Sequence, residues 1–284
     1  GEIKDYLNLS GNRKIQQKGL PKILIPTTSG TGAEVTNISV LALEHTKDVI
    51  MHDYLLADIA IVDPELTMTV PSRVTAATGA DALTHAIEAF ISVNANQYSD
   101  GHALQAIRLI GRSLKRAVDN GGDKQARTDM AYGSYLAGLS FFNAGVGAIH
   151  ALAYPLGGQF HLAHGESNAV LIPYVLGYIR KTCADKLNVI LHALTGKYHH
   201  LDTETGSLKC IEVLASLMKD IGIPQTLGGF NIPLTAAKAL DKDGIKQKRL
   251  LGRCPMELAE EDIFQIYEAA FSGVVKEAEE KILQ

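Results

Sequence analysis

The chain has 284 residues, of which 46% are hydrophobic and 20% are charged, the ordinary balance of a globular protein. Its formal net charge of −4, with the two signs interspersed, offers no basic surface for a nucleic acid or an anionic membrane. The three cysteines are odd in number and far apart, which favours free thiols over a disulfide framework. No apolar run reaches membrane-spanning length. We therefore expect a cytoplasmic protein with neither a nucleic-acid nor a membrane partner.

The first quarter of the sequence has the pattern of an α/β protein. A short apolar run, Lys22 to Pro26, predicts a strand that ends in a glycine-containing turn. Further strands are expected over residues 38–43 and 59–64, because both stretches are apolar and rich in β-branched residues. Two or three strands are few for a stable sheet. Either upstream sequence completes this sheet or another chain does, and we favour upstream sequence.

From Pro71 onward the periodicity is helical. Helices are predicted over residues 72–93, 103–118, 126–142, 207–221, 234–240 and 260–271, with glycine and proline between them. We therefore divide the chain into an α/β domain over residues 1–68 and an all-helical domain over residues 69–284.

The turn after the first strand is a candidate phosphate or ribose site. Its sequence, Thr-Thr-Ser-Gly-Thr-Gly over residues 27–32, offers backbone N–H groups and hydroxyls. Gly30 and Gly32 are not followed by the third glycine of the dinucleotide fingerprint. A tight turn with capping threonines explains the same residues. The spacing alone does not decide between the two interpretations.

Two short segments carry four candidate metal ligands. Asp81 and His85 share one face of a predicted helix that is apolar nearly all round, and a buried carboxylate is costly unless it is paired or bound to a metal. The segment between His150 and His164 is long enough for a helix turn, a break at Gly157–Gly158 and a return of the chain toward the first histidine. One carboxylate and three imidazoles suit Fe(II) or Zn(II). The alternative is a set of hydrogen-bonded core residues, and we prefer metal ligation.

Two neighbouring side chains are further candidates. Glu88 follows His85 by three residues and could orient a metal ligand, although a salt bridge accounts for it equally well. Tyr154 follows His150 by one helical turn. It could offer its hydroxyl as a hydrogen-bond or proton partner, or it could simply pack against its neighbours.

At these residues the chain resembles the iron-containing (group III) alcohol dehydrogenase family. The matching stretches are PTTSGTGAEVT, DPELTMTVPSRVTAATGADALTHAIEAF and NAGVGAIHALAYPLGGQFHLAHGESNAVLIPYV. The resemblance implies a dehydroquinate synthase-like (iron alcohol dehydrogenase) fold. This chain would then consist of an α/β remnant of a Rossmann-like NAD(P)-binding domain, followed by an all-α metal-binding domain. The family's pyrophosphate loop precedes the turn, so the N-terminal part of the cofactor domain is expected to be missing from this chain.

The resemblance also implies the roles of individual residues. The metal ligands, for Fe(II) or alternatively Zn(II), are Asp81, His85, His150 and His164. The contacts to NAD or NADP are Thr27, Thr28, Ser29, Gly30, Thr31 and Lys47. The catalytic positions are His150 and Tyr154, and many family members have a histidine in place of Tyr154.

The implied activity is reversible hydride transfer between NAD(P)(H) and a small primary or secondary alcohol or aldehyde, carried out by a homodimer. Two other functions stay open from the residues alone. One is a metallohydrolase that uses the same Asp/His group with Glu88 as general base. The other is a non-catalytic helical scaffold in which the buried Asp and His side chains merely pair.

The missing pyrophosphate loop leads to a prediction about cofactor binding. We expect the 284-residue chain to bind NAD(P) poorly or not at all, because a principal contact to the cofactor phosphates would be absent. Isothermal titration with NADH measures this directly. Tight, stoichiometric binding would contradict the prediction.

Overall fold

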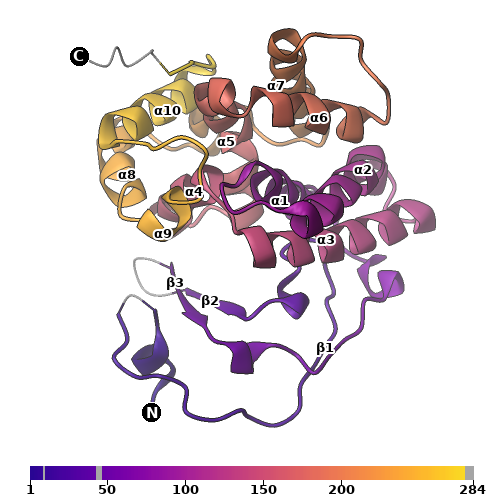
Figure 1. Ribbon diagram of the computed structural model, residues 1–284, viewed down its shortest axis with the longest axis vertical. Helices are drawn as coiled ribbons and strands as arrows, with labels where there is room; N and C mark the ends of the chain where they lie inside the picture. Colours follow the sequence, from indigo (N-terminus) through magenta and orange to yellow (C-terminus); the bar gives the residue numbers. More distant parts are fainter. Residues whose placement is uncertain (9, 43–46, 279–284) are drawn as a thin grey trace.

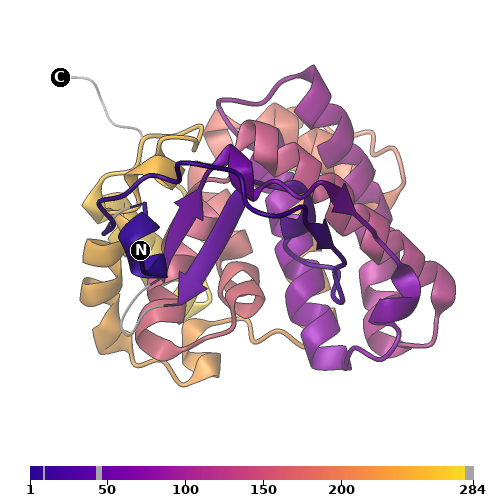
Figure 2. The same cartoon turned by 90° about the horizontal axis from the view of Figure 1, so that it is seen from below.

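Helices form most of the structure, and short strands lie along one side of them. The computed structural model describes residues 1–8, 10–42 and 47–278. Figure 1 shows the strands as a thin layer below the helices, and Figure 2 looks onto this layer from below. In the described residues every strand precedes Ile61 and every α-helix follows Pro71. This order agrees with the predicted α/β part and helical part, and their status as two domains stays a prediction.

The strands form two separate pairs. They are β1 (Ile23–Leu24), β2 (Ile38–Ala42), β3 (Lys47–Met51) and β4 (Ile59–Ala60). β1 runs parallel to β4 with Ile23 opposite Ile59, and β2 runs antiparallel to β3 with Val40 opposite Val49. All three predicted strands form, but β1 and β2 belong to different sheets. β3 was not predicted, because its five residues include a lysine and an aspartate and its partner strand supplies the pairing.

The helical part contains all the predicted helices and several more. The α-helices are α1 (Ser72–Ile91), α2 (Gln97–Asp119), α3 (Lys124–Ala144), α4 (Ala148–Phe160), α5 (His164–Ile179), α6 (Ala184–Thr195), α7 (Thr203–Asp220), α8 (Ala237–Gly244), α9 (Lys248–Leu251) and α10 (Glu260–Ser272). α2 begins at Gln97 rather than Ala103 because Asn96 caps it. The Asn96 side chain accepts hydrogen bonds from the backbone N–H groups of Tyr98 and Ser99.

The break between His150 and His164 lies later than predicted. Gly157 and Gly158 continue α4, which ends at Phe160. His161 follows in the left-handed conformation, with φ of 54°. α5 then begins at His164, so this histidine occupies the first position of its helix.

α1 is the central helix of the core. Every residue from Gly79 to Ile91 is buried, and the helix packs against α2, α3 and α5. The apolar, all-round pattern seen in the sequence therefore corresponds to a helix with no solvent face along this stretch. Asp81, His85 and Glu88 are consequently placed inside the protein.

The approach of α5 to α1 depends on a glycine next to His164. A Cβ atom built on Gly165 would lie 2.0 Å from the backbone oxygen of Ala77 in α1. No side chain fits in that space, so the two main chains are in direct contact at this point. The contact sets how closely His164 approaches Asp81.

None of the helices in the described ranges is both long enough and apolar enough to cross a membrane by itself. α3 and α4 satisfy that test of length and composition only as a pair, and they are bent by 106° at their junction.

The contact at Gly165 leads to a prediction about stability. Gly165→Ala should lower the free energy of unfolding by about 1–3 kcal/mol, because α5 must move away from Ala77 to accommodate the methyl group. Gly101→Ala is the matched control, since a Cβ atom on this α2 glycine would meet nothing within 4 Å. The control should be stabilised by about 0.5–1 kcal/mol. Chemical denaturation of both variants measures the difference, and equal stabilities would contradict the prediction.

Candidate metal centre

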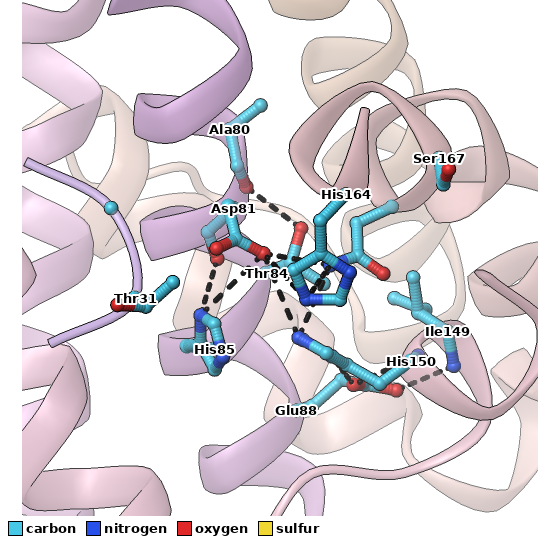
Figure 3. Close-up of polar contacts among 12 residues, drawn as sticks. Thr31, Ala80, Asp81, Thr84, His85, Glu88, Ile149, His150, His164 and Ser167 are labelled. Carbon is cyan, nitrogen blue, oxygen red and sulfur yellow. Dashed lines mark hydrogen bonds and ion pairs between the residues drawn. The ribbon is translucent and has the colours of Figure 1, made fainter. Parts of the chain in front are cut away.

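Three of the four predicted metal ligands converge. Asp81 comes from α1, His150 from α4 and His164 from the start of α5 (Figure 3). The Nε2 atoms of His150 and His164 lie 3.7 and 3.5 Å from Oδ1 of Asp81, and the three ligand atoms lie within 4.8 Å of one another. These distances are too long for hydrogen bonds. They are close to the separation of about 3.4 Å between two ligands of a tetrahedral cation, so the group fits a shared divalent cation.

His85 lies beside this group without joining it. Its Nδ1 hydrogen-bonds to the backbone oxygen of Asp81 at 2.9 Å and lies 3.7 Å from Oδ1 of the same residue. Its ring contacts those of His150 and Phe141, with centroid separations of 4.4 Å in both cases. Because Nδ1 is held by the backbone, Nε2 is the nitrogen of His85 that is suited to ligation. That ligation stays a prediction.

Glu88 fixes the orientation of the His150 ring. Its Oε2 lies 2.6 Å from Nδ1 of His150, and its Oε1 accepts a hydrogen bond of 2.6 Å from the backbone N–H of Ile149. Glu88 is only 2% exposed. With Nδ1 donating to Glu88, Nε2 of His150 faces Asp81. The contact is an ion pair between Glu88 and His150, as one interpretation expected, and the same contact fixes the orientation of the ring. The role of Glu88 in orienting a metal ligand stays a prediction.

The buried charges favour a cation at this point. Burial opposes the ionisation of Asp81, but the imidazoles of His85, His164 and His150 hold its pKa well below the usual value. Burial lowers the pKa of His85 to about 3, so this ring is neutral. Burial also disfavours charge on His150, but the carboxylates of Asp81 and Glu88 outweigh it and raise the pKa to about 9. The same two carboxylates would stabilise a divalent cation that replaces the proton.

Asn168 is a member of the site that sequence analysis did not identify. It is fully buried in α5, one turn after His164. Its Nδ2 lies 2.7 Å from Oδ1 of Asp81, and 3.1 and 3.4 Å from Nε2 of His150 and of His164. The spacing of four residues between His164 and Asn168 equals that between Asp81 and His85, and it is the signal that could have found this residue.

Tyr154 lies at the edge of the group. Its ring centroid is 6.0 Å from that of His164. Burial raises the pKa of its phenol, partly offset by the charge of Arg249. Tyr154 also lines a cavity of about 220 Å³ together with Asp48, Lys246 and Arg249. Tyr154 therefore lies near His164 and also lines a cavity beside β3, and its catalytic role stays a prediction.

The predicted cofactor turn is fixed to α3. The backbone oxygen of Gly30 accepts a hydrogen bond of 3.1 Å from the hydroxyl of Ser134. Gly32 adopts a left-handed conformation with φ of 61°, and a Cβ atom on Gly138 would lie 2.7 Å from its backbone oxygen. The turn is thus fixed by a glycine-to-glycine contact that leaves no room for a side chain.

The side chains of this turn face outward, except for Ser29. Thr27, Thr28 and Thr31 are exposed. The Ser29 hydroxyl is buried and has no hydrogen-bond partner within the described residues. Figure 3 shows the loop with Thr31 passing beside the helix of Asp81 and His85. The turn therefore lies next to the metal group, and its contacts to a cofactor stay a prediction.

Lys47 is the remaining predicted cofactor residue. Its backbone begins β3 opposite Ala42. Its side chain lies outside the part of the chain that the structure describes, so its contact to a ribose stays a prediction.

Comparisons with known proteins agree with this site. The profile of the "Fe-containing alcohol dehydrogenase family, C-terminal" matches residues 75–271, and that of "Iron-containing alcohol dehydrogenase" matches residues 1–64. Long-chain-alcohol dehydrogenase 1 of Geobacillus thermodenitrificans is 65% identical over 98% of this chain and 70% of that protein. The 1,3-propanediol dehydrogenase of Klebsiella pneumoniae is 41% identical over 88% of this chain and 65% of that protein.

Solved structures give the same result. A 1,3-propanediol oxidoreductase superposes with a TM-score of 0.90 at 37% identity, over 95% of this chain and 70% of that chain. Sulfoacetaldehyde reductase from Bifidobacterium kashiwanohense, in complex with NAD+, superposes with a TM-score of 0.83 at 29% identity, over 96% and 70%. The chain spans 65–70% of the length of the two curated relatives named above, and 53% and 46% of the length of two relatives described as "Probable alcohol dehydrogenase EutG", from Escherichia coli and Salmonella typhimurium. The fold and resemblance expected from the sequence are confirmed, and the chain belongs to the iron-containing alcohol dehydrogenase family.

Proposed function

We propose that the chain carries the metal site of an NAD(P)-dependent alcohol dehydrogenase, which transfers hydride reversibly between the nicotinamide and a primary or secondary alcohol or aldehyde. The observation that carries this proposal is the convergence of Asp81, His150 and His164 from three helices, at separations suited to one divalent cation. The names of relatives support it, among them an NAD-dependent methanol dehydrogenase of Bacillus methanolicus at 36% identity.

The residues fit the metal that the family implies. Asp81, His150 and His164 would hold Fe(II), or alternatively Zn(II), and Nε2 of His85 would complete the set. Bound there, the cation supplies Lewis-acid chemistry toward an alcohol or carbonyl oxygen. Asp81 offsets part of the cation's charge, and Glu88 keeps Nε2 of His150 directed toward the site.

The burial of the ligands indicates the direction from which a substrate would approach. The side chains of Asp81 and His150 are 4% and 2% exposed, whereas that of His164 is 29% exposed. A substrate would therefore enter past His164 and Tyr154. Because burial raises the pKa of Tyr154, its hydroxyl would stay protonated and donate a hydrogen bond to the substrate oxygen.

The turn beside the metal group would contact the cofactor. We assign Thr27, Thr28, Ser29, Gly30 and Thr31 to the nicotinamide and its ribose, and Lys47 to a ribose hydroxyl. The nicotinamide supplies the hydride acceptor or donor. The exposed hydroxyls of the threonines offer polar groups for such contacts, and the buried Ser29 hydroxyl has no hydrogen-bond partner among the described residues.

The two other functions have less support. A hydrolase would need Glu88 as a free base, but both of its oxygens are engaged, with Ile149 and with His150. A scaffold of paired core residues is compatible with the ion pairs between Asp81 and the two histidines, although their distances of 3.5 and 3.7 Å are longer than those of hydrogen bonds. The family match favours metal ligation over this interpretation.

Two wider properties stay predictions. The homodimer implied by the resemblance is proposed for the whole protein, and so is the cytoplasmic location suggested by the unpaired cysteines.

The first test of the proposal is the removal of the carboxylate at its centre. Asp81→Asn keeps the shape of the side chain but removes the charge, so bound metal should fall from about one ion per chain to below about a tenth. Elemental analysis after loading with Fe(II) or Zn(II) measures this. Asp129→Asn is the control, because Asp129 is buried but pairs with Arg112 away from the site. Full metal content in Asp81→Asn would rule out the proposed centre.

The second test concerns the orientation of His150. Glu88→Gln should weaken metal binding by about 10- to 100-fold. Ile149 and His150 contact different oxygens of Glu88, and glutamine has a donor NH₂ group in place of one of them. Competition with a chelator of known affinity measures the change. Glu212→Gln, on the exposed face of α7, should leave the affinity unaltered. If Glu88→Gln lowers the melting temperature but not the affinity, Glu88 only caps α4.

A further inference from the structure

A cavity of about 220 Å³ lies beside the proposed metal site, where α9 faces β3 (Figure 1). Its wall is formed mainly by residues of β3, by Tyr154 of α4 and by residues 246–249. Tyr154 belongs to both places, because the centroid of its ring is 6.0 Å from that of His164. A substrate that reaches the metal past Tyr154 would therefore have its far end in this cavity.

The described lining of this cavity has an excess of positive charge. Lys246, Lys248 and Arg249 are cations, whereas Asp48 is an acid. Lys246 pairs with Asp243 at 2.6 Å, and the carboxylate of Asp48 accepts hydrogen bonds from a serine near the N-terminus. Lys248 and Arg249 form no ion pair or side-chain hydrogen bond with any residue that the structure describes. Two cations of the cavity therefore lack a counter-ion within the described ranges.

A second arginine adds to the positive charge at this point. Arg253 follows Arg249 by four residues, and both side chains are partly buried. Arg253 packs against the end of α3, where a Cβ atom on Gly145 would lie 2.3 Å from its Cδ atom. It too forms no ion pair in the described part of the chain. Burial, together with the charge of Arg249, lowers the pKa of Arg253. Because these two cations repel each other and are partly removed from water, an anion beside Arg249 would be bound favourably.

The chemistry of arginine indicates which anion fits. A guanidinium group presents two parallel N–H groups to a carboxylate or a phosphate, and such charge-assisted pairs are among the stronger hydrogen bonds in proteins. We propose that this cavity binds a carboxylate at the far end of the substrate, with Arg249 as its main contact and Lys248 as a second cation. The preferred substrate is then an ω-hydroxy carboxylate, or the aldehyde formed from it. This inference rests on the proposed function and assigns a substrate class to it.

A phosphate of the cofactor is the other anion of suitable chemistry, but the position of the cavity favours the substrate. His164 is the most exposed of the three converging ligands, and Tyr154 lies between its neighbourhood and the cavity lining. The proposed cofactor turn is held on α3 instead, by the hydrogen bond between Ser134 and Gly30. The cavity thus lies on the side from which a substrate would approach.

The test compares ε-hydroxycaproate with n-hexanol, which has the same number of carbon atoms and no charge. The Co(II)-loaded 284-residue chain is titrated with each compound, and the visible absorption of the ion reports binding. ε-Hydroxycaproate should bind about 10- to 100-fold more tightly than n-hexanol, because it gains charge-assisted hydrogen bonds. Arg249→Gln should abolish this preference, and Arg249→Lys should keep part of it, since lysine retains the charge without the fork.

The matched control is Arg108→Gln. Arg108 is an exposed arginine of α2 that lines a different cavity, so its loss should leave the preference unchanged. A second measurement needs no variant. Raising the NaCl concentration should reduce the preference of the unmodified chain, because salt screens the pair between the carboxylate and Arg249. A preference that salt does not alter would contradict the proposal.

The possible failures are distinguishable. A chain that binds no Co(II), or whose Co(II) spectrum responds to neither compound, would overturn the proposed function and the carboxylate site with it. Equal affinities of the unmodified chain for the two compounds would overturn the carboxylate site alone. A preference that persists in Arg249→Gln would do the same, since the carboxylate would then bind elsewhere. Inorganic pyrophosphate is the probe for a cofactor phosphate. If Arg249→Gln weakens the binding of pyrophosphate but not that of ε-hydroxycaproate, Arg249 serves the cofactor and the proposal is wrong.

Discussion

The carboxylate of Glu88 is the interaction on which the metal centre depends. It connects α1 to α4 by accepting from the backbone of Ile149, and it fixes the ring of His150 at the same time. A helix N-terminus has N–H groups without intrahelical partners, so a buried acid there satisfies a need of the fold. The same bond sets which imidazole nitrogen faces Asp81. The side chain of Glu88 therefore contributes both to the stability of the fold and to the geometry of the metal ligands.

The rest of the site follows from the burial of α1. Asp81, His85 and Glu88 lie on a helix that has no solvent face there, so their polar groups must be satisfied inside the protein. His85 hydrogen-bonds to the backbone oxygen of Asp81, and Glu88 accepts a hydrogen bond from the N-terminus of α4. The Asp81 carboxylate accepts a hydrogen bond from the amide of Asn168. The histidines of α4 and α5 then surround a charge that no arginine or lysine neutralises among the described contacts. Such an arrangement suits a cation from solution.

Sequence patterns predicted what depends on local periodicity and composition. The helix of Asp81 and His85 was recognisable because its apolar residues surround the polar ones, and the turn over residues 27–32 was recognisable from its glycines. The resemblance then joined His150 and His164 to the same site. β3 and Asn168 were missed because tertiary contacts define them. The position of the break before His164 was wrong because Gly157 and Gly158 pack within α4, and helix termination falls to His161 instead.

The contact between Gly165 and Ala77 has a consequence for sequence variation. Where two helices meet through side chains, each change in core volume shifts their separation. Here the backbone of α1 touches α5 directly, one residue from His164. The distance between Asp81 and His164 is therefore insulated from substitutions elsewhere in the core. A side chain at position 165 would therefore change the position of His164 more directly than a change of volume elsewhere in the core.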